Sequence, residues 1–392
     1  MLKRVISIVI VVSLCCALLL VDQAHAAVTS VWTHSAMEKV YSWQSMPRTA
    51  TANISWVAAK NEYESAQILI RSNTSFTINS VTFTDLVSGP NLIDSRNFKY
   101  YFVEAPISYR PDELSTVASK QVSANTTQPI WVTVYIPSGS AAGNYTGTAT
   151  VNTTVGNFVV DISLEVNDVT IPELNSAEFS YTNQIMYPNN VSNLWPQYSR
   201  YSADWWNVVN NYADSMKEHR MNVILVNPVS LLIDGGTTIN NGVYNFNWSK
   251  FDEMIEYFID KSMVKYIEAT QICPTYNSES QCLNVQLIKK DANGNIISAD
   301  VPRTSSEADN WLRQYLPALK AHLQSKVLPG TSTTWFDIYR QHISDESQWA
   351  LDYRIIVDDY IDVYAPGLKI IDAFYQNLLI GTTYDGRLDT WV

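Results

Sequence analysis

Residues 202–228 read SADWWNVVNNYADSMKEHRMNVILVNP, and this stretch decides the fold class. Its first part spaces apolar side chains as an amphipathic helix does, and NVILVNP is a short apolar run typical of a buried strand. The same pairing recurs in KFDEMIEYFIDKSMV (250–264) before KYIEATQI (265–272), and in EADNWLRQYLPALKAHLQSKV (307–327) before TWFDIYRQHI (334–343). Strands alternating with helices of this length predict βαβ units and a parallel sheet.

The same alternation extends on both sides of these segments. We expect a first strand in EFSYTNQIMY (178–187), a helix in SQWALDYRIIVDDYIDVY (347–364), a fifth strand in LKIIDAFY (368–375) and the start of a sixth in RLDTWV (387–392). An open doubly wound sheet and a (β/α)8 TIM-type barrel both fit this order. No glycine-rich loop follows the first strand, so a nucleotide-binding sheet has no support. We therefore expect a partial (β/α)8 barrel over residues 178–392, with about five to six of the eight strands present and the chain a fragment.

The N-terminal half has a different pattern. Between residues 27 and 170, short alternating runs rich in Val, Ile, Thr, Tyr and Phe are separated by Asn, Gly, Ser and Pro clusters. Many short strands without helical periodicity predict an antiparallel β-sandwich. The runs are ANISWVAA, SAQILIR, INSVTFTDL, FKYYFVEA, PIWVTVYIP, YTGTATV and FVVDISLEV. A polar stretch around Pro172 ends the series, and we assign residues 171–177 to a linker.

The first 26 residues, MLKRVISIVIVVSLCCALLLVDQAHA, have the composition of a secretory signal peptide. Lys3 and Arg4 precede a long apolar run, and Ala24-His25-Ala26 is a small-x-small cleavage signal. An uncleaved anchor is the alternative, because the apolar run is near the lower length limit for a membrane span. Cleavage near Ala26 predicts a secreted protein with no membrane span after processing.

Charge and cysteine content narrow the possible partners. The formal net charge is −12, and Lys and Arg are scattered, so no electrostatic footprint for nucleic acid is present. The 12 Trp and 23 Tyr suit a protein that presents flat rings to sugars, and equally suit an aromatic core. Cys273 and Cys282 are expected to form a disulfide in an oxidising compartment, with two buried thiols as the alternative. Neither cysteine has the neighbours of a metal site, and the sequence implies no cofactor.

In a barrel of this kind, functional residues follow the carboxyl ends of the strands. Asp345 and Glu346, in QHISDESQW (341–349), stand after the predicted fourth strand, where a catalytic acid is wanted. They have a second reading, because Ser344 is a natural N-cap and acids stabilise the first turn of a helix. The other candidates at strand ends, expected to bind substrate, are Gln184, Asn227, His342, Asp372, Tyr375 and Trp391.

With these residues in place, the chain resembles glycoside hydrolase family 123. The resemblance is carried by AAKNEYESAQILIR, QPIWVTVYIPSGSAAGNYTGTATV, HRMNVILVNP, HISDES and LKIIDA. This family contains the β-N-acetylgalactosaminidases and many secreted bacterial relatives. The resemblance implies substrate-assisted catalysis, with Glu346 as the general acid/base and Asp345 as the residue that orients the 2-acetamido group. Relatives often read Asp-Glu-Pro, whereas this chain has Ser347.

The resemblance therefore implies a secreted glycoside hydrolase with a glycan substrate. It would cleave β-linked N-acetylhexosamine residues, of the N-acetylgalactosamine type, by a substrate-assisted retaining mechanism. The alternative is a catalytically incomplete member of the same lineage that binds glycans or belongs to the cell envelope.

Overall fold

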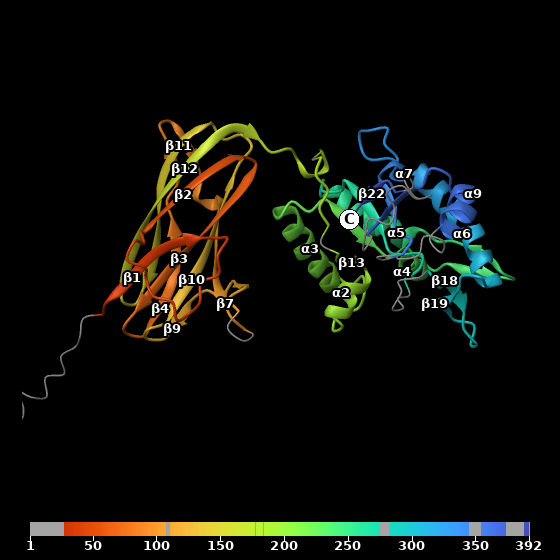
Figure 1. The fold of residues 1–392 in the computed structure, drawn as a ribbon, viewed down its shortest axis with the longest axis horizontal. Coiled ribbons are helices and arrows are strands. Elements are labelled where there is room, and N and C mark those ends of the chain that lie inside the picture. The colour runs from red at the N-terminus through yellow and green to blue at the C-terminus, as the bar shows by residue number, and fades with distance from the viewer. Residues whose placement is uncertain are drawn as a thin grey trace, which may run out of the picture. The chain divides into compact units, whose positions relative to one another are not determined.

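The computed structural model divides into two compact units, Met1–Ile171 and Pro172–Val392 (Figure 1). The division falls inside the predicted linker at residues 171–177. The structure describes residues 27–106, 110–176, 178–182, 184–274, 282–344, 354–373 and 388–391.

Two β-sheets pack on one apolar core in the first unit and form a β-sandwich. One sheet has the order β1–β3–β10–β7–β8 and consists of β1 (Thr29–Ser35), β3 (Glu62–Ser72), β10 (Thr127–Ile136), β7 (Phe98–Glu104) and β8 (Glu113–Ser115). The other has the order β2–β12–β11–β4–β9, with β5 paired to β11 and β6 paired to β5. It consists of β2 (Asn53–Lys60), β12 (Gly156–Thr170), β11 (Gly143–Thr153), β4 (Phe76–Phe83), β9 (Lys120–Val122), β5 (Leu86–Ser88) and β6 (Asn91–Ile93). A 3-10 turn, η1 (Ser95–Asn97), precedes β7.

Strand β12 shows why these residues form a sandwich. Val160, Ile162, Leu164 and Val166 are buried, and the residues between them are exposed. This period of two places every second side chain in the core, where each fully buried aliphatic residue contributes about 1.5–3 kcal/mol. One detail differs from the expected antiparallel sandwich: β12 pairs with β2 in parallel, with Ile162 opposite Ile54.

The second unit is built on a parallel sheet. In the described residues its strands have the order β13–β14–β17–β20–β21–β22, and every pair is parallel. The strands are β13 (Met186–Tyr187), β14 (Val223–Val226), β17 (Tyr266–Ala269), β20 (Tyr339–Gln341), β21 (Lys369–Asp372) and β22 (Thr390–Trp391). All six lie within predicted strand segments and in sequence order. In the described part of the chain they form an open, curled half-barrel, and the predicted TIM barrel is not confirmed.

Helices and two hairpins connect these strands. The helical elements are η2 (Leu174–Ser176), α2 (Asn189–Leu194), α3 (Ala203–Glu218), α4 (Pro228–Asp234), α5 (Ser249–Asp260), α6 (Ser306–Ser325), α7 (Trp335–Ile338), the π-helical segment η3 (Ile355–Ile361) and α9 (Asp362–Tyr364). The hairpins are β15 (Thr238–Asn240) with β16 (Val243–Asn245), and β18 (Asn284–Lys290) with β19 (Ile296–Pro302). None of the helices in the described ranges is both long and apolar enough to cross a membrane.

Helix α3 illustrates how the sequence specifies these helices. The Ser202 hydroxyl accepts a hydrogen bond from the Trp205 amide at 3.3 Å and caps the helix. Trp205, Val209, Ala213 and Met216 are buried on one face, at the spacing that an amphipathic helix requires. The helix therefore packs on the sheet with the face that its sequence predicts.

Two strands are shorter in the structure than the sequence predicted. The first begins only at Met186, and the segment at 334–343 begins with the helical turn α7 before β20. The second difference has a local cause: Thr334 and Asp337 form a capping box, in which each side chain binds the backbone of the other. The capping box starts a helix where the apolar content of WFDI suggested a strand.

Candidate functional site

The carboxyl ends of parallel strands meet at one edge of the sheet, and ligands of α/β proteins bind there. The register places Arg340 opposite Lys369 and Gln341 opposite Ile370, so His342 follows β20 close to Asp372 at the end of β21. On the other side, Ala269 of β17 is opposite Gln341. Strands β17, β20 and β21 therefore bring three polar segments together at this edge.

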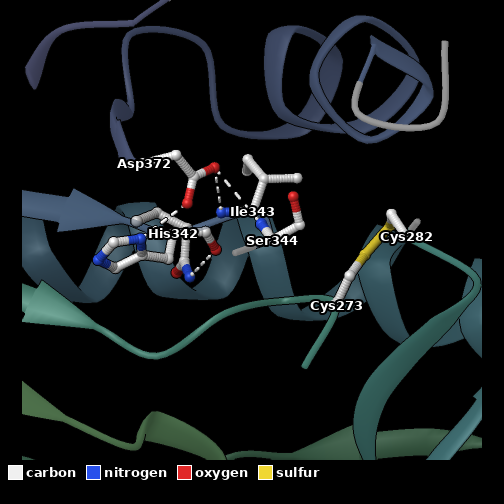
Figure 2. Close-up of a disulfide and its surroundings, with 7 residues drawn as sticks. Cys273, Cys282, His342, Ile343, Ser344 and Asp372 are labelled. Carbon is white, nitrogen blue, oxygen red and sulfur yellow. Dashed lines mark hydrogen bonds and ion pairs between the residues drawn. A yellow bond between two sulfur atoms is a disulfide. The ribbon is translucent and has the colours of Figure 1, made fainter. Parts of the chain in front are cut away.

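His342 lies between two carboxylates. Its Nδ1 is 2.7 Å from Asp372 Oδ1, and its Nε2 is 2.6 Å from Glu268 Oε1. The exposed fractions are 8% for His342, 4% for Glu268 and 1% for Asp372, so the group is buried. Figure 2 shows the His342 ring directed at the Asp372 carboxylate. We call Glu268, His342 and Asp372 the carboxylate–histidine cluster.

Burial and charge act in opposite directions on His342. Burial alone would lower the pKa of His342, but the hydrogen bonds and negative charges of Asp372 and Glu268 outweigh it and raise the pKa to about 9. Burial is also the main influence on Asp372 and raises its pKa to about 6, although His342 and two backbone amides favour its ionised form. At neutral pH, His342 is therefore an imidazolium that donates from both ring nitrogens, and Asp372 is a carboxylate.

The second oxygen of Asp372 binds the backbone. Asp372 Oδ2 accepts hydrogen bonds from the amide of Ile343 at 3.1 Å and from that of Ser344 at 3.4 Å (Figure 2). Carboxylates that accept backbone amides form charge-assisted hydrogen bonds, which are stronger than neutral ones. One side chain from β21 therefore holds both the imidazole and the backbone that follows β20.

The carbonyl groups of the same segment are held by the loop after β17. The amide of Ile272 donates to the His342 carbonyl at 3.0 Å, and the amide of Cys273 donates to the Ile343 carbonyl at 2.8 Å. Gln341 adds a side-chain amide that donates to the carbonyls of Thr270 at 2.8 Å and His342 at 2.9 Å. The segment is thus bonded on both sides. Asp372 of β21 accepts from the amides of Ile343 and Ser344, whereas β17 and its loop bind the amide of His342 and the carbonyls of His342 and Ile343.

Cys273 and Cys282 form a disulfide with a Cα–Cα distance of 5.1 Å. Figure 2 shows it close to Ser344, on the loop that binds the Ile343 carbonyl. The bond closes the loop that leaves β17 and returns to β18. It therefore restrains one of the two elements that hold residues 342–344.

Two polar atoms at this edge have no hydrogen-bond partner among the described residues. They are Glu268 Oε2 and Ser344 Oγ, and both are buried. The same residue ranges contain no group of three or more His, Cys, Asp and Glu side chains arranged to hold a metal ion.

The structure brings some of the predicted residues together. His342 and Asp372 are in direct contact, as above. Asn227 follows β14 at the same edge, where its side chain accepts from the Ser230 amide at 2.9 Å and caps α4. Gln184 is exposed and precedes β13, so it does not lie at the carboxyl end of the first strand as predicted. This difference arises because β13 begins only at Met186.

The remaining predicted residues are not placed by the structure. Asp345, Glu346 and Tyr375 lie outside the described residues. Trp391 ends β22 beside Asp372, and only its backbone position is described. Asp345 is nevertheless the residue bonded directly to Ser344, so the predicted pair continues the segment that the cluster holds.

Glu268 was missed by the sequence reasoning. It stands in YIEA, where every neighbour is apolar, in a strand that is buried in the sheet. Glu is almost never fully buried unless it is paired, so a single acid in a predicted buried strand is a usable signal of a partner. In β17 that partner is His342.

A hollow of about 550 Å³ in the first unit is one competing location for a site. It is lined by Tyr41, Trp43, Glu104 and Gln128, among others. The Glu104 carboxylate is already neutralised by Lys120, whose Nζ is 2.5 Å away. The hollow therefore offers aromatic surface but none of the buried, mutually charged groups that mark catalytic centres.

Comparison with protein families accounts for most of the chain. The profile described as the glycoside hydrolase 123 N-terminal domain matches residues 35–153, and the glycoside hydrolase 123 catalytic domain matches residues 188–385. No curated protein matches the chain in sequence.

Solved structures show the same fold. A family 123 glycoside hydrolase from Clostridium perfringens, whose structural analysis concerns the hydrolysis of glycolipid glycans, matches with a TM-score of 0.69 at 15% identity. The match covers 93% of this chain and 66% of that one, so this chain spans about two thirds of its length. The CooA pilin subunit from enterotoxigenic Escherichia coli covers 36% of this chain and 98% of its own, with a TM-score of 0.22 at 12% identity. A likeness that weak carries no argument.

Proposed function

Because the chain belongs to glycoside hydrolase family 123, we propose that it is a glycosidase that removes β-linked N-acetylhexosamine residues of the N-acetylgalactosamine type. The observation that carries the proposal is the place of Asp345 and Glu346 in the sequence. They lie inside the catalytic-domain match and come directly after residues 342–344, the described segment that leaves β20 at the carboxyl edge of the parallel sheet. An adjacent pair of acids at this place is what substrate-assisted hydrolysis requires.

In the proposed reaction the substrate supplies the nucleophile. The carbonyl oxygen of the 2-acetamido group attacks the anomeric carbon, and the bond to the leaving oxygen breaks. Glu346 donates its proton to that oxygen, and Asp345 stabilises the positive charge that develops on the acetamido nitrogen. Water then attacks the anomeric carbon, Glu346 takes a proton from it, and the acetamido group is released. Two inversions at one carbon retain the configuration.

The described residues support this proposal through preorganisation. A catalytic group must be held within a fraction of an ångström of its working position, because small displacements reduce rates strongly. The segment that leads into the pair is hydrogen-bonded from two directions, at the distances given above. These hydrogen bonds restrain the backbone beyond the last residue of β20, which is the part of the chain that precedes the acid pair.

We further propose that the protein is exported and that its substrate is a glycan outside the cytoplasm. The Cys273–Cys282 disulfide supports this, because disulfides persist in oxidising compartments. The N-terminal sequence supports it as well. The substrate of the Clostridium perfringens relative makes glycolipid glycans the first natural class to test.

The test uses the mature protein and 4-nitrophenyl 2-acetamido-2-deoxy-β-D-galactopyranoside. We expect hydrolysis with retained configuration, and Glu346→Gln should lower kcat/KM by about 10²–10⁴-fold because general acid/base catalysis contributes that much. Asp345→Asn should lower kcat to a similar extent. If Glu346→Gln is as active as the parent, the assignment is wrong. Tight glycan binding without turnover, unchanged in Asp345→Asn, would instead support the glycan-binding alternative.

A further inference from the structure

Asp372 has two separate binding tasks in one buried carboxylate. Its Oδ1 accepts from His342 at 2.7 Å, and its Oδ2 accepts from the amides of Ile343 and Ser344. Glu268, the other acid of the cluster, uses only one oxygen, since its Oε2 has no partner among the described residues. The two acids are therefore not equivalent, and only Asp372 joins the side chain of His342 to the backbone that follows it.

The backbone that Asp372 binds leads directly into the predicted acid pair. Ser344 is bonded directly to Asp345, and Glu346 is the next residue. Consecutive Cα atoms are about 3.8 Å apart, so Ser344 fixes the point at which the chain enters the acid pair. We infer that Asp372 is a positioning residue for the proposed reaction, because its carboxylate holds residues 342–344 and thereby the point from which Asp345 and Glu346 extend. This inference rests on the function proposed above.

The position of Asp372 on β21 suits this task. Strands of a sheet are more rigid than loops, and β21 pairs with β20 on one side and β22 on the other. The segment 342–344 is irregular backbone beyond the last strand residue, Gln341. The carboxylate therefore holds the amides of Ile343 and Ser344, which have no strand partner among the described residues.

The bonds from the β17 loop complete the arrangement but cannot replace Asp372. The amides of Ile272 and Cys273 bind the carbonyls of His342 and Ile343, whereas the amides of Ile343 and Ser344 find their acceptor in Asp372 alone among the described residues. Loss of Asp372 would leave these two buried donors without a partner. A buried unpaired donor costs about 1–3 kcal/mol, which favours movement of the segment.

The competing explanation is that Asp372 only neutralises His342 and stabilises the fold. Two substitutions separate the explanations. Asp372→Ala removes every acceptor, whereas Asp372→Asn keeps one oxygen for the backbone amides and turns an N–H toward a neutral His342. Positioning predicts that Asn rescues most of what Ala loses, and charge neutralisation predicts that it does not.

The matched control is Asp252→Ala. Asp252 of α5 is also a partly buried carboxylate on a histidine, since its Oδ1 is 2.6 Å from Nε2 of His322 in α6; its Oδ2 is 2.6 Å from Lys326 Nζ, and it holds no backbone amide of residues 342–344. Its loss tests the general cost of breaking such a pair. We expect Asp252→Ala to hydrolyse all substrates within about 2-fold of the parent.

The first measurement compares leaving groups on aryl 2-acetamido-2-deoxy-β-D-galactopyranosides. A 4-methoxyphenyl leaving group needs a proton from Glu346, and a 2,4-dinitrophenyl group does not. We expect Asp372→Ala to lower kcat by about 10²-fold on the first substrate, as for a displaced acid, and by less than about 10-fold on the second. Asp372→Asn should remain within about 10-fold of the parent on both. Equal losses on the two substrates, or no rescue by Asn, would overturn the inference.

The second measurement needs no activity. Amide hydrogen exchange over residues 342–344 should be at least about 10-fold faster in Asp372→Ala than in the parent, and close to the parent in Asp372→Asn and Asp252→Ala. Should the alanine variant not fold, rapid exchange at these amides in Asp372→Asn overturns the inference. An inactive parent with this exchange pattern would contradict the proposed function and leave the structural part of the inference standing. If exchange is unchanged in every variant and the parent is active, the inference about Asp372 is wrong and the proposed function stands.

Discussion

The two units of the chain use buried residues in opposite ways. In the sandwich, β12 alternates buried aliphatic side chains with exposed polar ones, and its partner β2 presents Ile54 and Trp56 to the same core. At the carboxyl edge of the parallel sheet, three adjacent strands bring together a buried imidazole and two buried acids. Burial of the aliphatic side chains is favoured by the hydrophobic effect, whereas burial of the charged groups costs free energy unless they are paired.

The difference shows what each region contributes. Burial of the sandwich core stabilises the fold directly, and many substitutions of similar volume would serve as well. The carboxylate–histidine cluster is less favourable than an apolar core of the same volume, because desolvation of charges offsets most of their attraction. The burial of this cluster therefore fits the positioning role proposed for Asp372 better than a role in stability.

Of the changes that test this difference between the two units, His342→Ala should have the largest effect on stability. The substitution leaves Glu268 and Asp372 buried without their shared cation, and loss of one partner from a buried ion pair costs about 3–5 kcal/mol. We expect the second unit to lose roughly this much free energy of unfolding at pH 7. Denaturant-dependent hydrogen exchange measures it, because the amides of the two units are followed separately.

The control for His342→Ala is internal. Amides of β10 and β12 in the sandwich should keep their unfolding free energies, since no residue of the first unit belongs to the cluster. The loss in the second unit should shrink at pH 5, which is below the raised pKa of Asp372 of about 6, so that this buried acid can take up a proton. A loss of the same size at both pH values would mean that the cavity, and not the unpaired charge, causes it.

The next largest effect should be the pH dependence of the free energy of unfolding of the second unit. The pKa of His342 is raised to about 9 in the folded protein, against about 6.5 when unfolded, so its contribution is complete below pH 6.5. We expect the free energy of unfolding to fall by up to about 3 kcal/mol as the pH rises from 6.5 to 9, since 1.36 kcal/mol corresponds to one pKa unit. Asp372, with its pKa raised to about 6, titrates below this window. Denaturation of the parent and of His342→Gln across the window checks this, and a parallel pH slope in both would contradict it.

Much of the fold was predictable because it depends on periodic burial. The alternation in FVVDISLEV and the helical spacing in DWWNVVNNYADSM each repeat over several residues, so one misread position does not change the assignment. The elements that were missed are short or depend on a turn. The β18–β19 hairpin is connected through Asn293-Gly294, with a positive φ of 85° at Gly294, a signal that was present but not used.

The site was only partly predictable, and the reason is its origin in distant segments. His342 and Asp372 were predicted because both stand near the carboxyl ends of predicted strands. Their partner Glu268 is 74 residues from His342, and it was not predicted because it lies in the middle of a predicted strand. Gln184 was misplaced because the strand predicted over residues 178–187 is longer than the two residues that pair as β13. Strand ends therefore locate a site, but tertiary pairing decides which residues share it.

A smaller effect is expected from removal of the Cys273–Cys282 disulfide. The bond closes a loop of 9 residues in sequence separation, for which loop-closure entropy gives about 2.5 kcal/mol. We expect Cys273→Ser with Cys282→Ser to destabilise the second unit by about this amount and to speed hydrogen exchange at Ile272 and Cys273. These amides hold the carbonyls of residues 342–343, so kcat should fall together with their protection. Faster exchange confined to the loop, with kcat unchanged, would show that Asp372 alone suffices to hold the segment.

The smallest effect should come from Ile162→Val in the sandwich. Ile162 is 2% exposed, and removal of one buried methylene costs about 0.5–1.5 kcal/mol through lost transfer energy and a small cavity. The cost should be the same at pH 5, 7 and 9, because Ile54 and the other core neighbours carry no charge. Hydrolysis of the aryl substrate should stay within about 2-fold of the parent. A pH-dependent cost at this position would remove the contrast between the two units, since it would mean that the apolar core of the sandwich and the charged edge of the parallel sheet are thermodynamically coupled.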